Sequence, residues 1–567
     1  MRNNKRFDII CLNNLPTVPF FFKKFLFTIK QVIQVRKSIK IIIFSCLINQ
    51  LFFLSAYVQD VIIKGNAPSY AGDELVFYSY SDMISFNEKK ISKCIVDQNG
   101  DFTFKLITDK TKSIFISLGV YNGIMYIEPN SCYEIKLPKK VDKAIEEQLN
   151  PYFQEIETHF GVINFASQIK SQYNHNNLHQ KPDSLIPDCT ALLRASSQFI
   201  SQAKTSRQES IRRIEKNSLD QDIISKGQEL NYYIRFFDDY YNIIFNKYVS
   251  YGYSTRNNSG LDSAINKIDS LFSGINNNYF VAYKKYKFGF LRHLADQYRS
   301  KSISNDFFLN QEVLYSNTAY MDLFNQIYDK YFLFFSRTKN GKKIYKDIGK
   351  EKSLFDLKET LGTDEILAND TLKELVILKG LHDGFYSDDF SRSALLQVLD
   401  SLYSQSKIPK HKLIAINIRN KVTRLLNGYE PPQFELYNQD NELVKLSQFK
   451  GKYVYLNFCI TQSYSCIREF EMLRSLTKKH GKILEIITIF SDKDLESSID
   501  FLNKNDYDWM FLHYGNQPHV LKDYDIRGFP TYFLIGPEGK LVMSPAPSPG
   551  EHFESYFFNT LKARGDL

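Results

Sequence analysis

The stretch Ile526-Arg527-Gly528-Phe529-Pro530-Thr531 decides the fold of the C-terminal part of the chain. It leads into the apolar run 531–535, after which the chain turns at Gly536-Pro537-Glu538-Gly539 and returns as residues 540–543. A proline directly before such a run predicts the start of a strand, because proline cannot donate a hydrogen bond within a sheet. These residues therefore predict two neighbouring strands near the end of the chain.

Upstream of this stretch, predicted strands and helices alternate. Continuous apolar runs predict buried strands, and apolar residues at helical spacing predict helices. The linker Asn427-Gly428-Tyr429-Glu430-Pro431-Pro432 marks where this pattern begins, so an α/β domain is expected over residues 427–567. The predicted strands are 453–460, 483–490 and 509–513, and the predicted helices are 463–479, 494–505, 518–524 and 551–563.

This domain resembles the TlpA/ResA-like branch of the thioredoxin superfamily. The resemblance is carried by residues 432–436, by residues 446–458 and by 526–531, which is similar to the family's cis-proline segment. It implies a thioredoxin fold in which Phe529, Pro530 and Thr531 bind an extended peptide through backbone hydrogen bonds.

The family's Cys-x-x-Cys motif falls on Ser463-Tyr464-Ser465-Cys466, so Ser463 stands at the nucleophile position and Cys466 at that of the resolving cysteine. In the family, the first cysteine lies at a helix N-terminus, which lowers the pKa of its thiol. A serine hydroxyl does not ionise there and cannot form a disulfide. Asn457 also replaces the buried carboxylate that many thioredoxins use as a proton acceptor. The resemblance therefore implies a degenerate active site.

Three functions follow from this resemblance. The domain is redox-inactive and binds client proteins at the cis-proline loop, or it performs slow thiol-disulfide exchange through Cys466 alone or with Cys459, or it is a peroxidase. The peroxidase hypothesis has the least support because the signature Pro-x-x-x-Thr-x-x-Cys is absent. We favour the first function, with both cysteines as small core residues. Cys459 and Cys466 could form a redox pair with a spacing different from that of Cys-x-x-Cys. Such a displaced pair would require their Cα atoms to lie within about 7 Å of each other.

Most of the positive charge precedes residue 57. Residues 1–56 carry nine basic side chains and one acidic side chain, so they account for +8 of the formal net charge of +9. The remainder gives no electrostatic reason to bind nucleic acid. Basic residues precede the apolar run Ile41–Leu54, which is typical of a secretory signal sequence. Because this run of about 14 residues is shorter than a membrane span, a secretory signal sequence is favoured. An uncleaved membrane anchor is the alternative.

The sequence therefore predicts an exported protein of the periplasm or cell envelope, with protein or peptide clients in that compartment. Disulfides persist in such an environment. An odd number of cysteines follows the leader, which leaves at least one thiol unpaired. These cysteines are Cys94, Cys132, Cys189, Cys459 and Cys466.

Residues 57–140 are predicted to form a β-sandwich, because short alternating runs such as Glu74–Tyr78 are separated by turn signals. The segment 97–101 contains Asn-Gly, which tolerates the positive φ of a hairpin turn. Cys94 and Cys132 fall on predicted strands and are either cross-strand partners or two buried small side chains.

Residues 141–426 are predicted to be helical, because apolar residues recur at helical spacing while glycine and proline become rare. Aromatic residues concentrate in 230–245, 280–298 and 320–335. Such stripes form the core of a helical array far more often than a ligand groove. The expected fold class is thus multidomain, with an all-β sandwich, an α-helical middle and a C-terminal α/β thioredoxin fold.

Other chemistry finds little support in the sequence. It contains no Cys-x-x-Cys, no Gly-x-Gly-x-x-Gly and no Gly-x-Ser-x-Gly, so we expect neither a metal site nor a cofactor. His513 and His519 flank a predicted loop and are expected at the surface.

Overall fold

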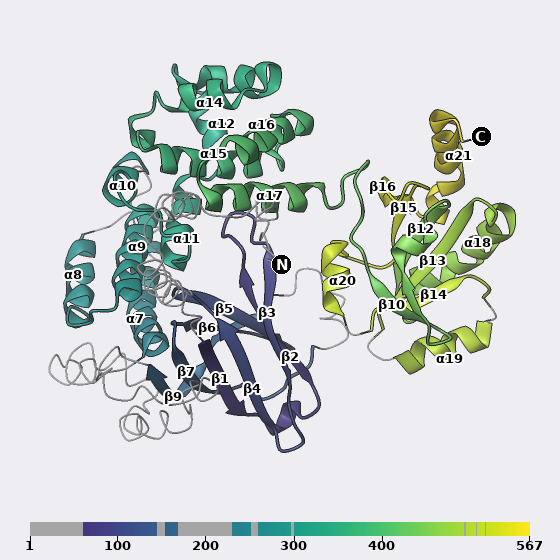
Figure 1. The fold of residues 1–567 in the computed structure, drawn as a ribbon, viewed down its shortest axis with the longest axis horizontal. Coiled ribbons are helices and arrows are strands. Elements are labelled where there is room, and N and C mark those ends of the chain that lie inside the picture. The colour runs from purple at the N-terminus through teal and green to yellow at the C-terminus, as the bar shows by residue number, and fades with distance from the viewer. Residues whose placement is uncertain are drawn as a thin grey trace, which may run out of the picture. The chain divides into compact units, whose positions relative to one another are not determined.

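The computed structural model describes residues 60–143, 154–167, 229–250, 259–295, 300–492, 495–505, 507–515 and 517–566. Along this part of the chain, strands come first, helices follow and an α/β region comes last (Figure 1). The three-part fold class predicted from the sequence is therefore confirmed. The predicted leader, with its apolar run Ile41–Leu54, lies outside the described residues. Within them, no helix has the length and apolar character needed to cross a bilayer.

Two sheets make up the N-terminal region. A four-stranded sheet has the order β4-β1-β7-β9, and a five-stranded sheet has the order β3-β2-β5-β6-β8. Buried and exposed residues alternate along the strands, as in β4, where Phe102, Phe104 and Leu106 enter the core. The strands are β1 (Asp60–Asn66), β2 (Glu74–Tyr80), β3 (Glu88–Ile95), β4 (Asp101–Ile107), β5 (Lys112–Leu118), β6 (Tyr121–Ile127), β7 (Ser131–Lys136), β8 (Ile156–His159) and β9 (Gly161–Ser167).

Two features of this region differ from the expectation. The predicted turn at residues 97–101 is present, with Gly100 at a φ of 87°, but it connects β3 to a strand of the other sheet and closes no hairpin. Residues 156–167 form β8 and β9, which pair with β6 and β7. The expectation of helices from residue 141 onward is therefore wrong for this segment, because pairing with strands that already exist overrides the local pattern.

The two cysteines of the N-terminal region lie in different sheets. Cys94 is on β3 of the five-stranded sheet, and Cys132 is on β7 of the four-stranded sheet. They are therefore not cross-strand partners within one sheet, which was one of the two alternatives. Burial raises the pKa of the Cys94 thiol to about 11. Cys189 lies outside the described residues.

Helices form the middle of the chain, and the aromatic stripes fill their core as predicted. Phe237 is fully buried, and its ring packs against those of Phe272 and Phe280 at centroid distances of 5.6 and 5.9 Å. Tyr320 and Phe324 are also fully buried. The helices are α7 (Leu230–Phe245), α8 (Leu261–Leu271), α9 (Asn278–Ala295), α10 (Ser300–Phe307), α11 (Thr318–Ile327), α12 (Tyr331–Ser336), α13 (Ile344–Lys346), α14 (Leu354–Leu361), α15 (Asp370–Gly384), α16 (Arg392–Gln405) and α17 (Pro409–Thr423).

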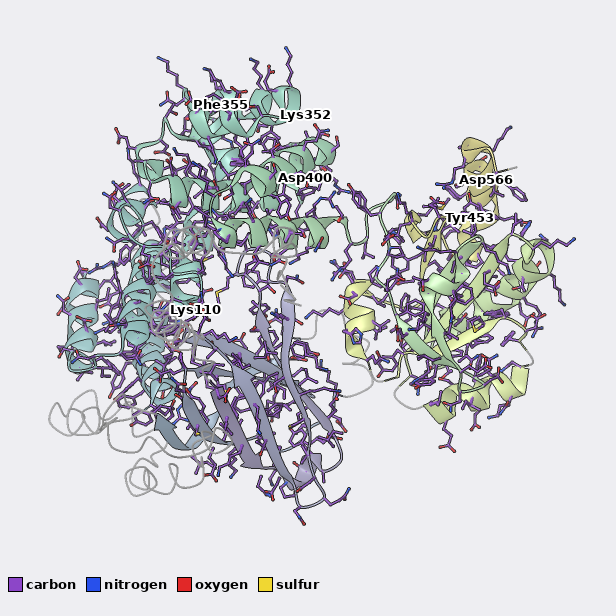
Figure 2. All side chains as sticks on the ribbon, in the orientation of Figure 1. Lys110, Lys352, Phe355, Asp400, Tyr453 and Asp566 are labelled. Carbon is purple, nitrogen blue, oxygen red and sulfur yellow. The ribbon has the colours of Figure 1, made fainter. Side chains whose placement is uncertain are left out.

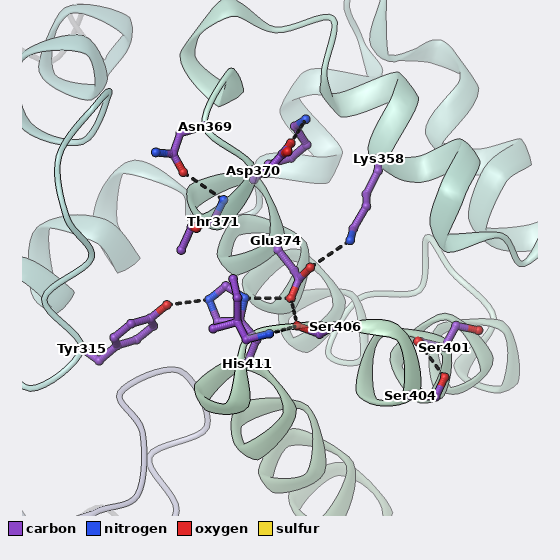
Figure 3. Close-up of polar contacts among 12 residues, drawn as sticks. Tyr315, Lys358, Asn369, Asp370, Thr371, Glu374, Ser401, Ser404, Ser406 and His411 are labelled. Carbon is purple, nitrogen blue, oxygen red and sulfur yellow. Dashed lines mark hydrogen bonds and ion pairs between the residues drawn. The ribbon is translucent and has the colours of Figure 1, made fainter. Parts of the chain in front are cut away.

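A buried carboxylate joins several of these helices (Figure 3). Glu374 on α15 accepts hydrogen bonds from Lys358 Nζ at 2.8 Å and from Ser406 Oγ, and it lies 2.8 Å from Nδ1 of His411. Nε2 of His411 lies 2.8 Å from the hydroxyl of Tyr315. Burial tends to raise the pKa of Glu374, but the hydrogen bonds from His411, Lys358 and Ser406 outweigh burial and lower it to about 2. The Glu374 carboxylate is thus ionised, and both of its oxygens accept hydrogen bonds.

The C-terminal region is built on a seven-stranded sheet of order β11-β10-β14-β13-β12-β15-β16. Every residue of β12 is buried, and this strand runs parallel to β13 and antiparallel to β15. Separate apolar cores cover the two faces of the sheet. The elements are β10 (Glu435–Asn438), β11 (Leu443–Lys445), β12 (Tyr453–Cys459), α18 (Tyr464–His480), β13 (Leu484–Phe490), α19 (Leu495–Asn505), β14 (Met510–His513), α20 (Pro518–Asp523), β15 (Thr531–Ile535), β16 (Leu541–Ala546) and α21 (Phe553–Arg564).

Helix α21 packs on the N-terminal half of β12. The ring of Phe557 contacts that of Tyr453, and Phe553 stacks on Tyr455 at a centroid distance of 3.8 Å. Figure 2 labels Tyr453 and Asp566 near this helix, and the Tyr453 hydroxyl donates a hydrogen bond to the Asp566 carboxylate. These contacts cover the N-terminal end of β12. The loop that follows its C-terminal end and leads to α18 is therefore the place where functional residues can lie. Short 3-10 and π turns complete the structure: η1 (Pro68–Tyr70), η4 (Asn246–Ser250), η5 (Gly341–Lys343), η6 (Asp347–Glu351), η7 (Glu365–Leu367), η8 (Leu446–Phe449) and η9 (Pro549–Glu551).

Candidate functional site

Helix α18 begins directly after the loop that follows β12. Ser463 is its N-cap residue, with an extended backbone at φ −84° and ψ 112°, and its Oγ accepts a hydrogen bond from the N–H of Cys466 at 3.4 Å. Serine is among the best N-cap residues, because its oxygen satisfies one of the free N–H groups of the first helical turn. Ser463 therefore has a structural task at the position where the sequence predicts a lost nucleophile.

Replacing Ser463 by alanine is expected to lower the free energy of unfolding of the C-terminal domain by about 1 kcal/mol, the usual value of an N-cap. Guanidinium denaturation followed by the fluorescence of Trp509, the single tryptophan of the chain, measures this loss. Ser463→Asn keeps an oxygen acceptor and is the matched control, expected within about 0.5 kcal/mol of the wild type. An equal loss in both variants would contradict the capping role.

The two cysteines of the domain meet beneath this helix start. Cys459 ends β12 and Cys466 lies in the first turn of α18, and both side chains are fully buried. Interaction with the side chain of Cys459 is the main cause that lowers the pKa of Cys466, whereas burial is the main cause that raises the pKa of Cys459. Nδ2 of Asn457 also donates to Cys459 Sγ at 3.4 Å. Both cysteines belong to the same apolar core of the domain.

A buried carboxylate lies next to this pair. Glu469, one turn after Cys466 on α18, is 4% exposed and accepts a hydrogen bond from the Tyr532 hydroxyl at 2.7 Å. Burial is the main cause that raises the pKa of Cys459 and of Tyr532, and the charge of Glu469 adds to it in both cases. Sequence reasoning missed Glu469. Its position three residues after Cys466, on the same helical face, was the available signal.

The loop between β12 and α18 is held by a second buried carboxylate. Asp492, which follows β13, accepts hydrogen bonds from the Thr461 N–H at 3.0 Å and from its hydroxyl at 2.7 Å. The hydroxyl of Ser498 donates to the same carboxylate at 3.3 Å. Because β12 and β13 are parallel, their following loops meet at one edge of the sheet. Asp492 thereby fixes the approach to the helix start, and the sequence analysis did not identify it.

The prediction that His513 lies at the surface is wrong, because this side chain is buried. It is 7% exposed, its Nε2 lies 2.9 Å from the backbone oxygen of Asp492, and its Nδ1 accepts a hydrogen bond from the N–H of Gly515 at 3.0 Å. Its position at the end of an interior strand explains the burial. His519 is exposed as expected.

The predicted cis-proline loop lies beside the same edge. The Phe529–Pro530 peptide bond is cis, and the Thr531 hydroxyl donates to the carbonyl oxygen of Gly528 at 2.7 Å. Thr531 pairs with Phe458, the residue before the end of β12, so the loop runs next to the segment that leads to α18. Phe529 contacts the apolar cores on both faces of the sheet.

Within the described part of the chain, no cluster of three or more His, Cys, Asp or Glu side chains could hold a metal ion. The prediction that the sequence contains no His-x-x-x-His spacing is wrong, because His175 and His179 have it. Both lie outside the described residues.

Comparisons with known proteins identify the domain that carries this site. A family model described as Redoxin matches residues 426–555. Thiol-disulfide oxidoreductase ResA of Bacillus subtilis is 29% identical over 137 residues, which are 24% of this chain and 75% of that protein. ResA of Bacillus cereus is 30% identical over 125 residues, 22% of this chain and 71% of that protein. The chain belongs to the redoxin family.

A solved structure, the thioredoxin domain of a thiol-disulfide oxidoreductase from Bacteroides vulgatus, is 24% identical and aligns with 24% of this chain and 99% of that chain, at a TM-score of 0.22. The matched family model and the two ResA relatives confirm the predicted resemblance to the TlpA/ResA-like group for the C-terminal part of the chain. The matched residues of the redoxin domain contain the whole candidate site. They include none of the sandwich and none of helices α7 to α17.

Proposed function

We propose that this exported protein uses its redoxin domain to bind extended segments of client proteins in the cell envelope, without exchanging disulfides with them. The single observation that carries this proposal is that a serine caps the start of the helix while both thiols of the domain are fully buried. Ser463 caps α18, while Cys459 and Cys466 are both 0% exposed. A client disulfide therefore meets a hydroxyl and no accessible sulfur.

An exposed apolar face supports the binding role. Tyr464 on the first turn of α18 is 76% exposed and Ile467 is 38% exposed. The half-buried Phe529 lies in the neighbouring loop, which the pairing of Thr531 with Phe458 brings alongside. Exposed apolar side chains that gather at one place mark interaction surfaces, and tyrosine is favoured there because it offers a large rigid contact area.

Export and the kind of client remain parts of this proposal. The basic residues and the apolar run Ile41–Leu54 support a secretory leader or a membrane anchor. The curated relatives are thiol-disulfide oxidoreductases by name. We infer that the domain keeps the recognition of extended protein segments and has lost exchange at position 463.

Replacing Tyr464 by serine is expected to weaken client binding about fivefold, which corresponds to the roughly 1 kcal/mol that a contacting tyrosine contributes. The probe is fluorescein-labelled α-lactalbumin that has been reduced and carboxymethylated, because it is unfolded and has no free thiol. Fluorescence anisotropy with the purified full-length protein gives the dissociation constant.

Tyr556→Ser is the matched control. Tyr556 is 53% exposed on α21, which packs at the other end of β12, so this variant is expected to bind like the wild type. Absence of binding by the wild type, or equal weakening in both variants, would overturn the proposed face. Reduction of insulin disulfides by the wild-type protein at the rate of an active thioredoxin would overturn the absence of exchange.

A further inference from the structure

A cavity of about 430 Å³ is lined by helices α9, α11, α15 and α17 and by the loop between β2 and β3. We propose that this cavity binds a small zwitterion with an apolar side chain, that is, a free amino acid or a dipeptide. Its volume is in the usual range of small-molecule sites. The cavity lies outside the redoxin domain, so the inference does not depend on client binding there.

The loop between β2 and β3 is a fixed wall of the cavity. Asn325 Nδ2 donates a hydrogen bond to the carbonyl oxygen of Met83 at 2.7 Å. Lys421 Nζ donates one to the carbonyl oxygen of Ser85 at 2.6 Å. Between these two points, Ile84 is 2% exposed and belongs to the core of the helical region. Because the loop is already held by α11 and α17, a ligand does not have to order it on binding.

Asp322 on α11 contributes an unmatched negative charge to the lining. Within the described part of the chain, its carboxylate forms no hydrogen bond and no ion pair. Burial raises the pKa of Asp322 to about 6, and the charge of Lys287 offsets this only in part. Lys287 itself lies 3.7 Å from the carboxylate of Asp238. An ammonium group of a ligand would give the Asp322 carboxylate the counter-charge that it lacks.

Lys421 on α17 contributes the complementary positive charge. Its Nζ uses one donor on the Ser85 carbonyl, and no carboxylate of the described residues forms an ion pair with it. Burial and the charge of Arg424 lower the pKa of its ammonium group, so a nearby anion would stabilise the charged form. Lys379, another lysine of the lining, is already paired with Asp383 at 2.5 Å. A carboxylate of the ligand is therefore expected at Lys421.

Two acceptors on lining residues also lack a donor among the described residues. They are Oδ1 of Asn325 and Nε2 of His382. Nδ1 of His382 lies 3.2 Å from the Asp383 carboxylate, so in the neutral ring Nδ1 carries the proton and Nε2 is the acceptor. A buried acceptor without a donor costs free energy. These two atoms favour a ligand that brings N–H groups.

Apolar side chains form another part of the lining. Phe86 of the β2–β3 loop is 45% exposed, and Phe290 of α9 is half-buried. An apolar wall with a few polar groups that fix orientation is typical of small-molecule sites. The wall accommodates an aliphatic or aromatic side chain, while Asp322 and Lys421 bind the two charged ends of the ligand.

The test is a saturation-transfer NMR titration of the purified full-length protein, in which the leucine methyl signals report binding. The probes are leucine, leucyl-leucine, N-acetyl-leucyl-leucine and leucyl-leucine amide. We expect the tighter of the two zwitterions, leucine or leucyl-leucine, to bind with a dissociation constant below about 1 mM, and their ratio identifies the occupant. Blocking either charged end of leucyl-leucine is expected to weaken its binding by about tenfold or more, because each end makes a charge-assisted contact.

Two variants assign the ends of the ligand. Asp322→Asn is expected to weaken leucyl-leucine about tenfold and to leave N-acetyl-leucyl-leucine, which has no ammonium group, unchanged. Lys421→Gln keeps a donor for the Ser85 carbonyl, and we expect it to weaken leucyl-leucine similarly and to leave leucyl-leucine amide unchanged. Asp306→Asn is the matched control, because Asp306 is exposed on α10 and does not line the cavity.

Three results would contradict the inference. The first needs no variant: neither leucine nor leucyl-leucine binds to the wild type at up to about 10 mM, ten times the expected limit. The second is that the two blocked peptides bind as tightly as leucyl-leucine, which would exclude recognition of the charged ends. The third is that Asp322→Asn and Lys421→Gln bind leucyl-leucine as well as Asp306→Asn does, which would place the ligand outside this cavity.

Discussion

Replacing Ser463 by cysteine is expected to raise the rate of insulin disulfide reduction by on the order of 100-fold or more, because loss of a nucleophile commonly costs at least this much. The new thiol would occupy the N-cap of α18, where the helix dipole and the free N–H groups lower the pKa of a thiol. Cys466, one turn further on, would resolve the mixed disulfide. The surrounding scaffold already has the fold and the cis-proline loop that the reaction uses.

The measurement is the turbidity assay of insulin reduction with dithiothreitol as the electron donor. Ser463→Ala is the matched control and is expected to be as inactive as the wild type, since it changes the cap but adds no sulfur. The double variant Ser463→Cys with Cys466→Ser would form a mixed disulfide and fail to turn over. If Ser463→Cys folds like the wild type and remains inactive, the missing sulfur is not what separates this domain from an active enzyme.

Replacing Glu374 by alanine is expected to lower the free energy of unfolding of the helical region by about 3 kcal/mol. Removing one partner of a buried ion pair costs about 3–5 kcal/mol. The value lies at the low end because the Lys358 side chain is 36% exposed and can turn to water. His411 and Ser406 would lose the acceptor that holds them. Urea denaturation followed by far-ultraviolet circular dichroism gives the free energy.

Glu365→Ala is the matched control, because it breaks the exposed pair with Lys301, in which Glu365 is 84% exposed. It is expected to change stability by less than about 1 kcal/mol. Equal effects of the two substitutions would contradict the role of Glu374 as a buried centre of the helical core.

The pH dependence follows from the same carboxylate. The pKa of Glu374 in the folded state is about 2, below its ordinary value of 4.5. Its contribution to stability is therefore complete above about pH 4.5 and is lost as the pH falls from there toward 2. We expect the stability difference between the wild type and Glu374→Gln to shrink over this range. A difference that stays constant down to pH 3 would contradict the lowered pKa.

Much of the redoxin domain could be predicted because its elements are long and its signals are local. The helix expected at 463–479 and the strand expected at 483–490 lie within one residue of α18 and β13. Strand β6 carries a weaker local signal because Gly123 interrupts its pattern. That glycine is required by packing, since the ring of Phe160 lies 2.1 Å from where a Cβ atom would stand. Such a close approach between segments far apart in sequence leaves no local signal.

The candidate site was predicted only in part, for a similar reason. The residues Ser463, Cys466 and Pro530 carry a motif or a resemblance and could be found in the sequence. Glu469 has only its spacing from Cys466 as a signal and Asp492 has none, because a carboxylate in a helix or loop is exposed by default and only the tertiary fold buries it. The burial of both cysteines in one apolar core likewise depends on how a strand end, a loop and a helix turn back on one another.

The central claim is that the redoxin domain offers no sulfur to a protein client. Iodoacetamide labelling of the reduced full-length protein, mapped by mass spectrometry, tests it most directly, with the Ser463→Cys variant as the positive control. We predict that Cys459 and Cys466 stay unlabelled in the native protein and label fully after unfolding in guanidinium, whereas the introduced cysteine labels rapidly in the native state. Labelling of Cys466 in the native wild type at the rate of a free thiol would contradict the account.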